Sequence, residues 1–301
     1  MIDFKPVEIS DKQWVDPIVM AEDSLSADYN FGNIFMWDSS FHQLIAKFDD
    51  RMIVMPTYGT APFFAYPIGS GEIAPAVEAM RAYALDHSFP LVIRGVTADH
   101  IPLLSEVFPG RFDFTEDRSF WDYVYSAEKL STLAGKKLHG KRNHINRFIE
   151  ENEWSFEPLT PDRAGECMAM LDDWTARNAE FEGAGLDDEH AAIARGFANF
   201  SALGLEGGIL RVGGRLAAFT VGEKICSNGF NVHFEKAFAD INGAYPMVNR
   251  EFVRQILDRH PEIQYINRED DMGHESLRQA KLSYYPDLMV EKYTARWRED
   301  S

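Results

Sequence analysis

Segments with strand-like and helix-like spacing of apolar residues alternate along the whole chain, and this alternation limits the folds that it can adopt. Glu72–Asp86 repeats its apolar residues at helical spacing, whereas Leu91–Val96 is rich in β-branched residues and follows a proline. Such alternation predicts an α/β or α+β architecture of layered sheets and helices. Because 301 residues exceed a usual domain of roughly 100–200, we expect two domains, 1–125 and 126–301.

Two predicted hairpins occupy corresponding places in the two halves. Phe41–Phe48 and Arg51–Met55 flank Asp49-Asp50, and two further strands flank Gly213-Gly214, where both glycines accept the positive φ of a tight turn. Prolines that precede strands recur at similar offsets, as Pro90 and Pro109 and then as Pro261 and Pro286. We therefore predict two copies of one unit of hairpin, helix, strand, helix and strand. Coincidence within an alternating chain is the other interpretation.

The charge of the chain excludes some functions. A net charge of −18 repels polyanions, so general nucleic-acid binding is not expected, and a local basic cluster becomes informative. No segment approaches the roughly 20 apolar residues of a membrane span, and the start resembles no secretory signal, so we expect a cytoplasmic protein. Cys167 and Cys226 lack the spacing of a disulfide framework or a zinc site, and no metal is expected.

The basic segment Gly135–Phe148 is the first candidate for ligand binding. If it is helical, Lys137 and Lys141 share one face, and Gly140 leaves backbone amides open near the helix start. Such a helix start with adjacent cations can bind an anion. The predicted phosphate contacts are Lys137, Lys141, Arg142 and Arg147. The alternative is a solvated amphipathic helix that pairs with the two glutamates at its end.

An acidic stretch follows a predicted strand near the end of the chain. Carboxylates from Glu269 to Asp271 at the end of this strand could bind a positively charged amino group or deprotonate an attacking amine. Asp270 and Asp271 are our candidates for catalysis here. The alternative is a polar turn before a capped helix.

Two cations follow this acidic stretch on a predicted helix. Arg278 and Lys281 are three residues apart and share a face, so they could hold a phosphate group or a developing oxyanion. A surface ion pair between Glu275 and Arg278 is the alternative. Tyr285 could donate a proton to a leaving group, although a tyrosine before a proline also serves in packing.

The strand predicted over Asn228–Ala237 carries a third group of candidates. Strict alternation places His233 and Glu235 on one face, where either could act as a base. A histidine with satisfied hydrogen bonds in the core is the other interpretation of His233.

Four segments in this order resemble the family of the C-terminal domain of phosphatidylglycerol lysyltransferases, a tandem GNAT-like group related to the Fem aminoacyl ligases. They are YNFGNIFMW (29–37), KKLHGKRNHINRF (136–148), HFEKA (233–237) and NREDDMGHESLRQAKLSYYP (267–286). The resemblance implies tandem GNAT-like domains with mixed, mostly antiparallel sheets. It also implies transfer of an acyl or aminoacyl group onto an amine or hydroxyl acceptor, with donor-binding residues at Arg278 and Lys281.

One segment departs from the acetyl-CoA-dependent members that the chain resembles. Those members carry a glycine-rich loop whose amides bind pyrophosphate, whereas DINGAYPMVNRE keeps only Gly243 of that pattern. We therefore expect another donor, such as an aminoacyl-tRNA, or a CoA thioester bound differently, and no tightly bound cofactor. The alternative hypothesis is a non-catalytic, degenerate GNAT-like protein that binds a ligand.

Overall fold

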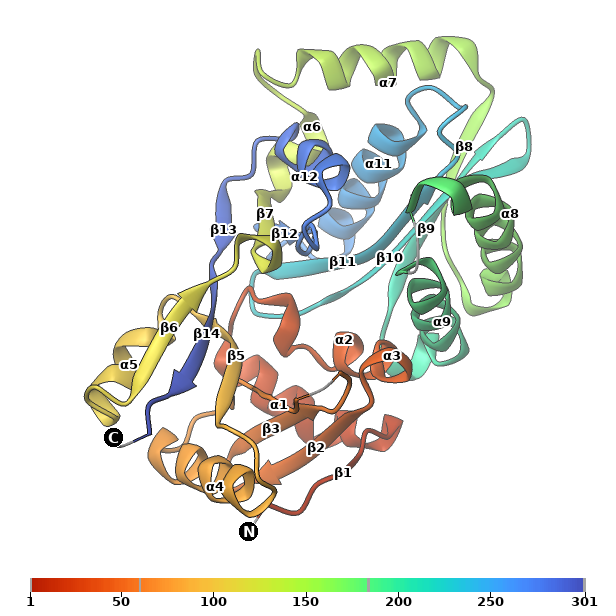
Figure 1. Cartoon of the computed structure of the whole chain (residues 1–301). Helices are drawn as coiled ribbons and strands as arrows, with labels where there is room; N and C mark the ends of the chain where they lie inside the picture. The colour runs from red at the N-terminus through yellow and green to blue at the C-terminus, as the bar shows by residue number, and fades with distance from the viewer. Residues whose placement is uncertain (1, 60, 183–184, 300–301) are drawn as a thin grey trace.

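Three sheets form the frame of the computed structural model, which describes residues 2–59, 61–182 and 185–299 (Figure 1). A three-stranded sheet has the order β1 (Lys5–Pro6), β2 (Gln43–Phe48), β3 (Arg51–Pro56). A four-stranded sheet has the order β4 (Phe64–Ala65), β5 (Val92–Thr97), β14 (Lys292–Trp297), β6 (Phe112–Glu116). A seven-stranded sheet has the order β13 (Leu288–Val290), β7 (Asp122–Ser126), β12 (Tyr265–Asn267), β11 (Gly229–Ala237), β10 (Arg215–Lys224), β9 (Glu206–Val212), β8 (Trp154–Pro158). The predicted mixed, mostly antiparallel architecture is confirmed.

Helices cover these sheets, and most of them bury apolar residues in the two hydrophobic cores. Those of the first half are α1 (Lys12–Glu22), α2 (Phe31–Met36), α3 (Asp38–Phe41), α4 (Ile73–Asp86) and α5 (His100–Val107). Those of the second half are α6 (Ala127–Thr132), α7 (His139–Glu151), α8 (Ala164–Glu182), α9 (Gly185–Ala198), α10 (Phe200–Leu203), α11 (Ala244–Arg259) and α12 (Glu275–Leu282). Asn199 separates α9 from α10.

The two faces of the seven-stranded sheet belong to different hydrophobic cores. Ile209 and Phe219 pack into a core shared with α8, α9 and the first half of the chain. Their neighbours Leu210 and Ala218 pack on the opposite face, against α6, α7 and α11. Strand alternation therefore places this sheet between two buried layers.

Each half receives a strand from the other half, as the sheet orders show. In the second half β11 and β12 are parallel neighbours, and β7 is inserted between β12 and β13. In the first half β4 and β5 are parallel neighbours, and β14 is inserted between β5 and β6. The two arrangements are equivalent, which supports the repeated unit. Sheet membership does not follow the predicted boundary at 125/126, which cuts β7, and the two domains stay a prediction.

The two hairpins were predicted from the sequence, whereas the break in the last strand segment, 288–297, was not. The hairpins form as predicted, with Asp49 at φ 51° and Gly213 and Gly214 at φ 55° and 76°. The closing strand, however, is not continuous. It breaks at Glu291, because β13 pairs in the seven-stranded sheet while β14 crosses to the four-stranded sheet.

A buried ion cluster lies where the exchanged strands begin. The Nζ atom of Lys292, at the start of β14, is 2.7 Å from Oδ1 of Asp122 in β7 and 2.7 Å from Oδ1 of Asp28. Asp122 also accepts hydrogen bonds from the backbone amide of Ala27 and from Asn267. Burial alone would lower the pKa of Lys292, but the two carboxylates raise it, so the amine stays charged. This cluster joins both exchanged strands to the segment before α2.

We predict that Lys292→Ala lowers the free energy of unfolding by about 3–5 kcal/mol at pH 7, because it leaves a buried carboxylate without its cation. Urea denaturation followed by circular dichroism measures this change. The control is Lys224→Ala, whose ion pair with Glu262 is partly exposed and should contribute at most about 1 kcal/mol. Equal midpoints for the two variants would contradict the role of the cluster.

Candidate functional site

A cavity of about 600 Å³ lies between the first half of the chain and the loop that follows β12. Its floor is the open face of the four-stranded sheet. Its walls include aromatic side chains, among them Trp37 between α2 and α3, Phe41 at the end of α3 and Tyr58 in the loop after β3. Its charged, amide and threonine side chains are Asp28, Asn33, Gln43, Arg94, Thr115, Glu116, Asp117, Glu269, Asp270, Lys292, Thr294 and Arg296. Both halves of the chain therefore build this site.

Glu269 is held rigidly at the edge of this cavity. Its Oε1 atom accepts hydrogen bonds from Asn231 at 2.7 Å, His233 at 3.0 Å and Asn33 at 3.3 Å. Its backbone adopts φ 58°, which is rare for a residue with a Cβ and typical of functional turns. Burial raises the pKa of Glu269, but the hydrogen bond and positive charge of His233, together with the hydrogen bond from Asn231, outweigh this effect and lower it. An oriented, anionic carboxylate is the result.

His233 bridges two carboxylates and supports Glu269. Its Nδ1 atom lies 3.0 Å from Glu269 and its Nε2 atom 3.1 Å from Glu223, and its side chain is fully buried. Burial lowers the pKa of His233, but both carboxylates raise it, to about 9. An imidazolium that is protonated at neutral pH cannot accept a proton, so this geometry does not support the predicted base role of His233.

A β-bulge separates His233 from Glu235, contrary to the predicted shared face. Val221 pairs with Phe234 while Gly222 pairs with Val232, so His233 is the extra residue and the alternation changes phase after it. Glu235 consequently lies under α11, where it pairs with Arg268 at 2.9 Å and accepts a hydrogen bond from Asn249. The prediction was wrong because strict alternation cannot anticipate a bulge.

Asp270 is the carboxylate in the cavity that is best suited to proton transfer. It is half-buried, lines the cavity, and accepts a hydrogen bond of 2.9 Å from the backbone amide of Met272. Burial raises the pKa of Asp270 to about 7, and the nearby ammonium of Lys292 counteracts only part of this effect. A carboxyl group with this pKa can accept and return a proton near neutral pH.

Asp271 and Arg278 bind each other instead of facing the cavity. Arg278 donates two parallel hydrogen bonds of 2.9 and 3.0 Å to the carboxylate of Asp271, which also accepts one from the hydroxyl of Tyr123 at 2.5 Å. Burial raises the pKa of Asp271, but these donors outweigh it and lower the pKa to about 2. Neither residue lines the cavity. Their geometry favours a structural pair over the predicted base and donor-binding roles.

Lys281 holds the loop from behind. Its buried ammonium donates to the backbone carbonyls of Arg268, at 2.6 Å, and of Asp270. Burial lowers the pKa of Lys281 to about 8. Lys281 does not line the cavity, so its contacts position the loop that carries Glu269 and Asp270.

The four predicted phosphate contacts of the basic segment do not converge. Lys137 and Lys141 lie over the rings of Tyr285 and Tyr284, at 5.2 and 4.1 Å from the ring centroids. Arg142 donates to the backbone carbonyls of Leu133 and Gly135, and Arg147 forms an exposed ion pair with Glu151 at 2.7 Å. None of the four, nor Tyr285, lines the cavity.

The start of α11, where CoA-dependent members bind pyrophosphate, is covered by α7 (Figure 1). A Cβ atom at Gly243 would lie 2.6 Å from the backbone oxygen of His144 and 2.9 Å from Cβ of Phe148, both in α7. His144 also lies 3.2 Å from Asn242, in the loop before α11. This close packing disfavours a bound pyrophosphate at this helix start.

Several residues of the site escaped the sequence analysis. Asn33 and Asn231 donate hydrogen bonds to Glu269, Glu223 pairs with His233, and Asp28 and Lys292 line the cavity. Glu223 and Asn231 lie in otherwise buried strands. The signal that could have identified Glu223 and Asn231 is the presence of a polar residue inside an otherwise apolar strand.

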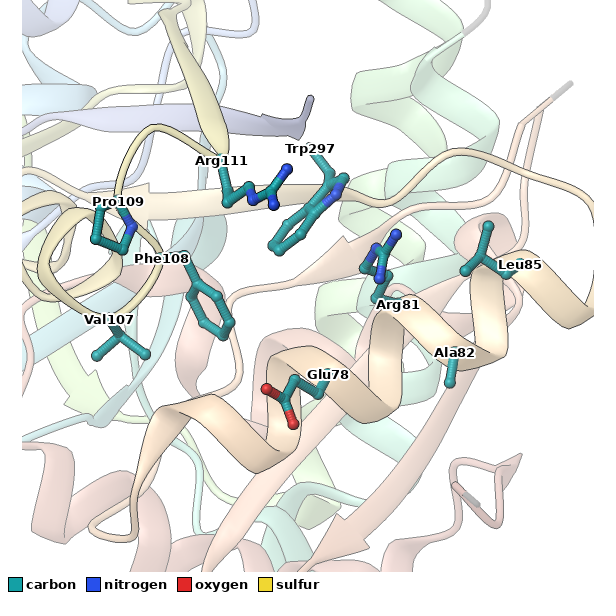
Figure 2. A pocket seen from close by; sticks show the side chains of 9 residues that line it. All are labelled: Glu78, Arg81, Ala82, Leu85, Val107, Phe108, Pro109, Arg111 and Trp297. Carbon is teal, nitrogen blue, oxygen red and sulfur yellow. The ribbon is translucent and has the colours of Figure 1, made fainter. Parts of the chain in front are cut away.

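A second hollow, of about 520 Å³, lies between α4, the end of α5 and β14 (Figure 2). Its arginines, Arg81 and Arg111, flank the indole of Trp297 at 5.0 and 5.9 Å from the ring. Glu78 is its only carboxylate among the described lining residues. Without paired carboxylates it offers no acid and base, so we take the larger cavity as the candidate site.

Solved structures with the same fold cover nearly the whole chain. A conserved protein of unknown function from Bacteroides thetaiotaomicron is 37% identical, with a TM-score of 0.94 over 99% of this chain and 100% of that one. L-PGS from Bacillus licheniformis is 14% identical, with a TM-score of 0.61 over 99% and 94%. A tandem GNAT protein from the clavulanic acid biosynthesis pathway is 11% identical, with a TM-score of 0.51 over 100% of both chains. The tandem GNAT-like fold is confirmed.

Sequence comparison identifies the family. An uncharacterized protein from Mycoplasmoides gallisepticum is 23% identical over 180 residues, which are 58% of this chain and little more than half, 56%, of that protein. None of the helices in the described part of the chain is long and apolar enough to cross a membrane. The family profile described as "Phosphatidylglycerol lysyltransferase, C-terminal" matches residues 23–296. The chain therefore belongs to the family of the phosphatidylglycerol lysyltransferase C-terminal domain.

Proposed function

We propose that this chain transfers an aminoacyl or related acyl group from an activated ester to an amine or hydroxyl acceptor, within the larger cavity. One observation carries the proposal: two adjacent carboxylates in the cavity have pKa values that are shifted in opposite directions. The pKa of Glu269 is lowered, whereas that of Asp270 is raised to about 7. Two neighbouring carboxylates whose pKa values differ in this way are typical of sites in which one group stays charged and the other transfers a proton.

Glu269 binds the ammonium group of the aminoacyl donor in this proposal. Three side-chain donors fix its Oε1 atom, so the carboxylate stays anionic and oriented. The aromatic side chains Trp37, Phe41 and Tyr58 provide an apolar wall that excludes water from the bound ester. Exclusion of water favours transfer over hydrolysis.

Asp270 acts as the general base. It removes a proton from the attacking nitrogen or oxygen of the acceptor, which forms a bond to the ester carbonyl carbon. The tetrahedral intermediate then collapses, the ester C–O bond breaks, and the proton held by Asp270 passes to the leaving oxygen. Lys292 also lines the cavity and holds a positive charge near the developing oxyanion.

An aminoacyl-tRNA fits this site better than a CoA thioester as the donor. The family is named for lysyl transfer, and α7 covers the helix start that would bind the CoA pyrophosphate. Because the net charge of −18 repels a polyanion, we expect the chain to contact the tRNA only near its aminoacyl ester.

We predict that Asp270→Asn lowers the transfer rate about 100-fold or more, which is the usual contribution of a general base. The assay is transfer of a labelled amino acid from mixed aminoacyl-tRNA to an added amine. In the wild type the rate should rise with pH through about 7, because Asp270 is active when deprotonated, and the variant should lose this rise. The control is Asp162→Asn at an exposed carboxylate. Wild-type turnover in Asp270→Asn would remove this residue from the mechanism.

We also predict that a non-hydrolysable 3′-aminoacylamino-adenosine raises the melting temperature, whereas acetyl-CoA does not. Glu269→Gln should abolish this shift because the ammonium group loses its anionic partner, while Glu275→Gln on the exposed face of α12 should keep it. Thermal denaturation at matched ligand concentrations measures both effects. An equal shift with acetyl-CoA would contradict the choice of donor. Stabilisation without turnover would support the non-catalytic alternative.

A further inference from the structure

Two arginines lie on neighbouring strands of the cavity floor. Arg296 in β14 pairs in register with Val92 of β5, and Arg94 follows two residues later in β5, beside the register shift between Tyr293 and Ala295. Neighbouring strands lie roughly 4.7–4.9 Å apart and each guanidinium ends a long side chain, so both groups can reach one ligand group. Both residues line the cavity.

Neither arginine is neutralised within the part of the chain that the structure describes. The chain has 48 acidic residues and most of its arginines form ion pairs, but none of the described carboxylates pairs with Arg94 or Arg296. Arg94 instead stacks on the ring of Phe63, at 4.0 Å from the centroid. This stacking fixes the guanidinium plane and leaves its N–H donors available.

The charged side chains of the cavity come from two main sources. Glu269 and Asp270 come from the loop after β12 and face the proposed reaction centre. Arg94 and Arg296 come from the four-stranded sheet, which forms the floor and also contributes Glu116 at the end of β6. Guanidinium groups are therefore found on the floor and not on the loop after β12, so a ligand that spans the cavity can contact the arginines at one end and Asp270 at the other.

We propose that Arg94 and Arg296 bind an oxyanion group of the acceptor, a phosphate or a carboxylate, and thereby direct its nucleophile toward Asp270. The identification of the ligand as the acceptor rests on the proposed transfer reaction, whereas anion binding by the two arginines does not. Guanidinium groups bind both oxyanions through paired N–H donors, which adds orientation to affinity. The acceptor is then a molecule with a nucleophilic amine or hydroxyl at one end and a negative charge at the other.

The test is isothermal titration calorimetry of the whole chain with inorganic phosphate and, separately, with acetate. Arg94→Gln and Arg296→Gln should each weaken the better-bound anion at least about tenfold, since a charge-assisted hydrogen bond is lost. The control is Arg215→Gln, at an exposed arginine of the β9–β10 hairpin outside the cavity, which should bind like the wild type. Higher ionic strength should weaken binding in the wild type more than in the double variant.

Two results would overturn the inference. One is a wild type that binds neither phosphate nor acetate, and the other is a double variant that binds them as tightly as the wild type does. Both arginines are exposed, so circular dichroism should show that the variants fold.

Asp270→Asn separates this inference from the proposed reaction. This variant should lose transfer but keep the anion affinity of the wild type. If the wild type shows no transfer although its anion binding depends on Arg94 and Arg296, the transferase proposal fails and the anion site stands.

Discussion

The contact of Lys292 with two carboxylates links the halves of the chain, and the cavity depends on it. Asp122 begins β7 in the seven-stranded sheet, Lys292 begins β14 in the four-stranded sheet, and both are buried. Their ion pair therefore fixes the position of each exchanged strand relative to the other. The floor of the cavity comes from the sheet that contains β14, and its acidic wall follows β12, which pairs with the other exchanged strand, β7. The exchange therefore keeps the guanidinium and carboxylate groups of the cavity at a fixed separation.

The loop after β12 shows how backbone geometry assigns different roles to adjacent acids. Glu269 adopts a positive φ and faces His233, Asp270 faces the cavity, and Asp271 turns to Arg278. Their pKa values diverge accordingly: that of Glu269 is lowered, that of Asp270 is about 7 and that of Asp271 is about 2. Three successive carboxylates thus differ because each meets different donors and a different degree of burial.

Much of the fold could be predicted from the sequence because its signals are local. Apolar spacing and turn residues located both hairpins and the helix α4, and the recurring turns and prolines indicated a repeated unit. The sequence also pointed to the acidic stretch after β12, and Asp270 does line the cavity. Local signals could not distinguish ligand-binding residues from structural ones among the candidates on α7 and α12. Spacing on a helix gives the face of a residue but not its partner, and Arg278 and Arg147 have carboxylate partners.

The sequence by itself determined the order of helices and strands, the net negative charge and the position of the acidic stretch, since each follows from neighbouring residues. Tertiary structure alone decided the site. Asn33 and Glu269 are hydrogen-bonded although they are 236 positions apart in the sequence. Lys292 and Asp122 are also hydrogen-bonded, although they are 170 positions apart. A bulge of one residue also moved Glu235 away from His233. Burial and charge partners set the pKa of a carboxylate, and both arise only when distant segments pack together.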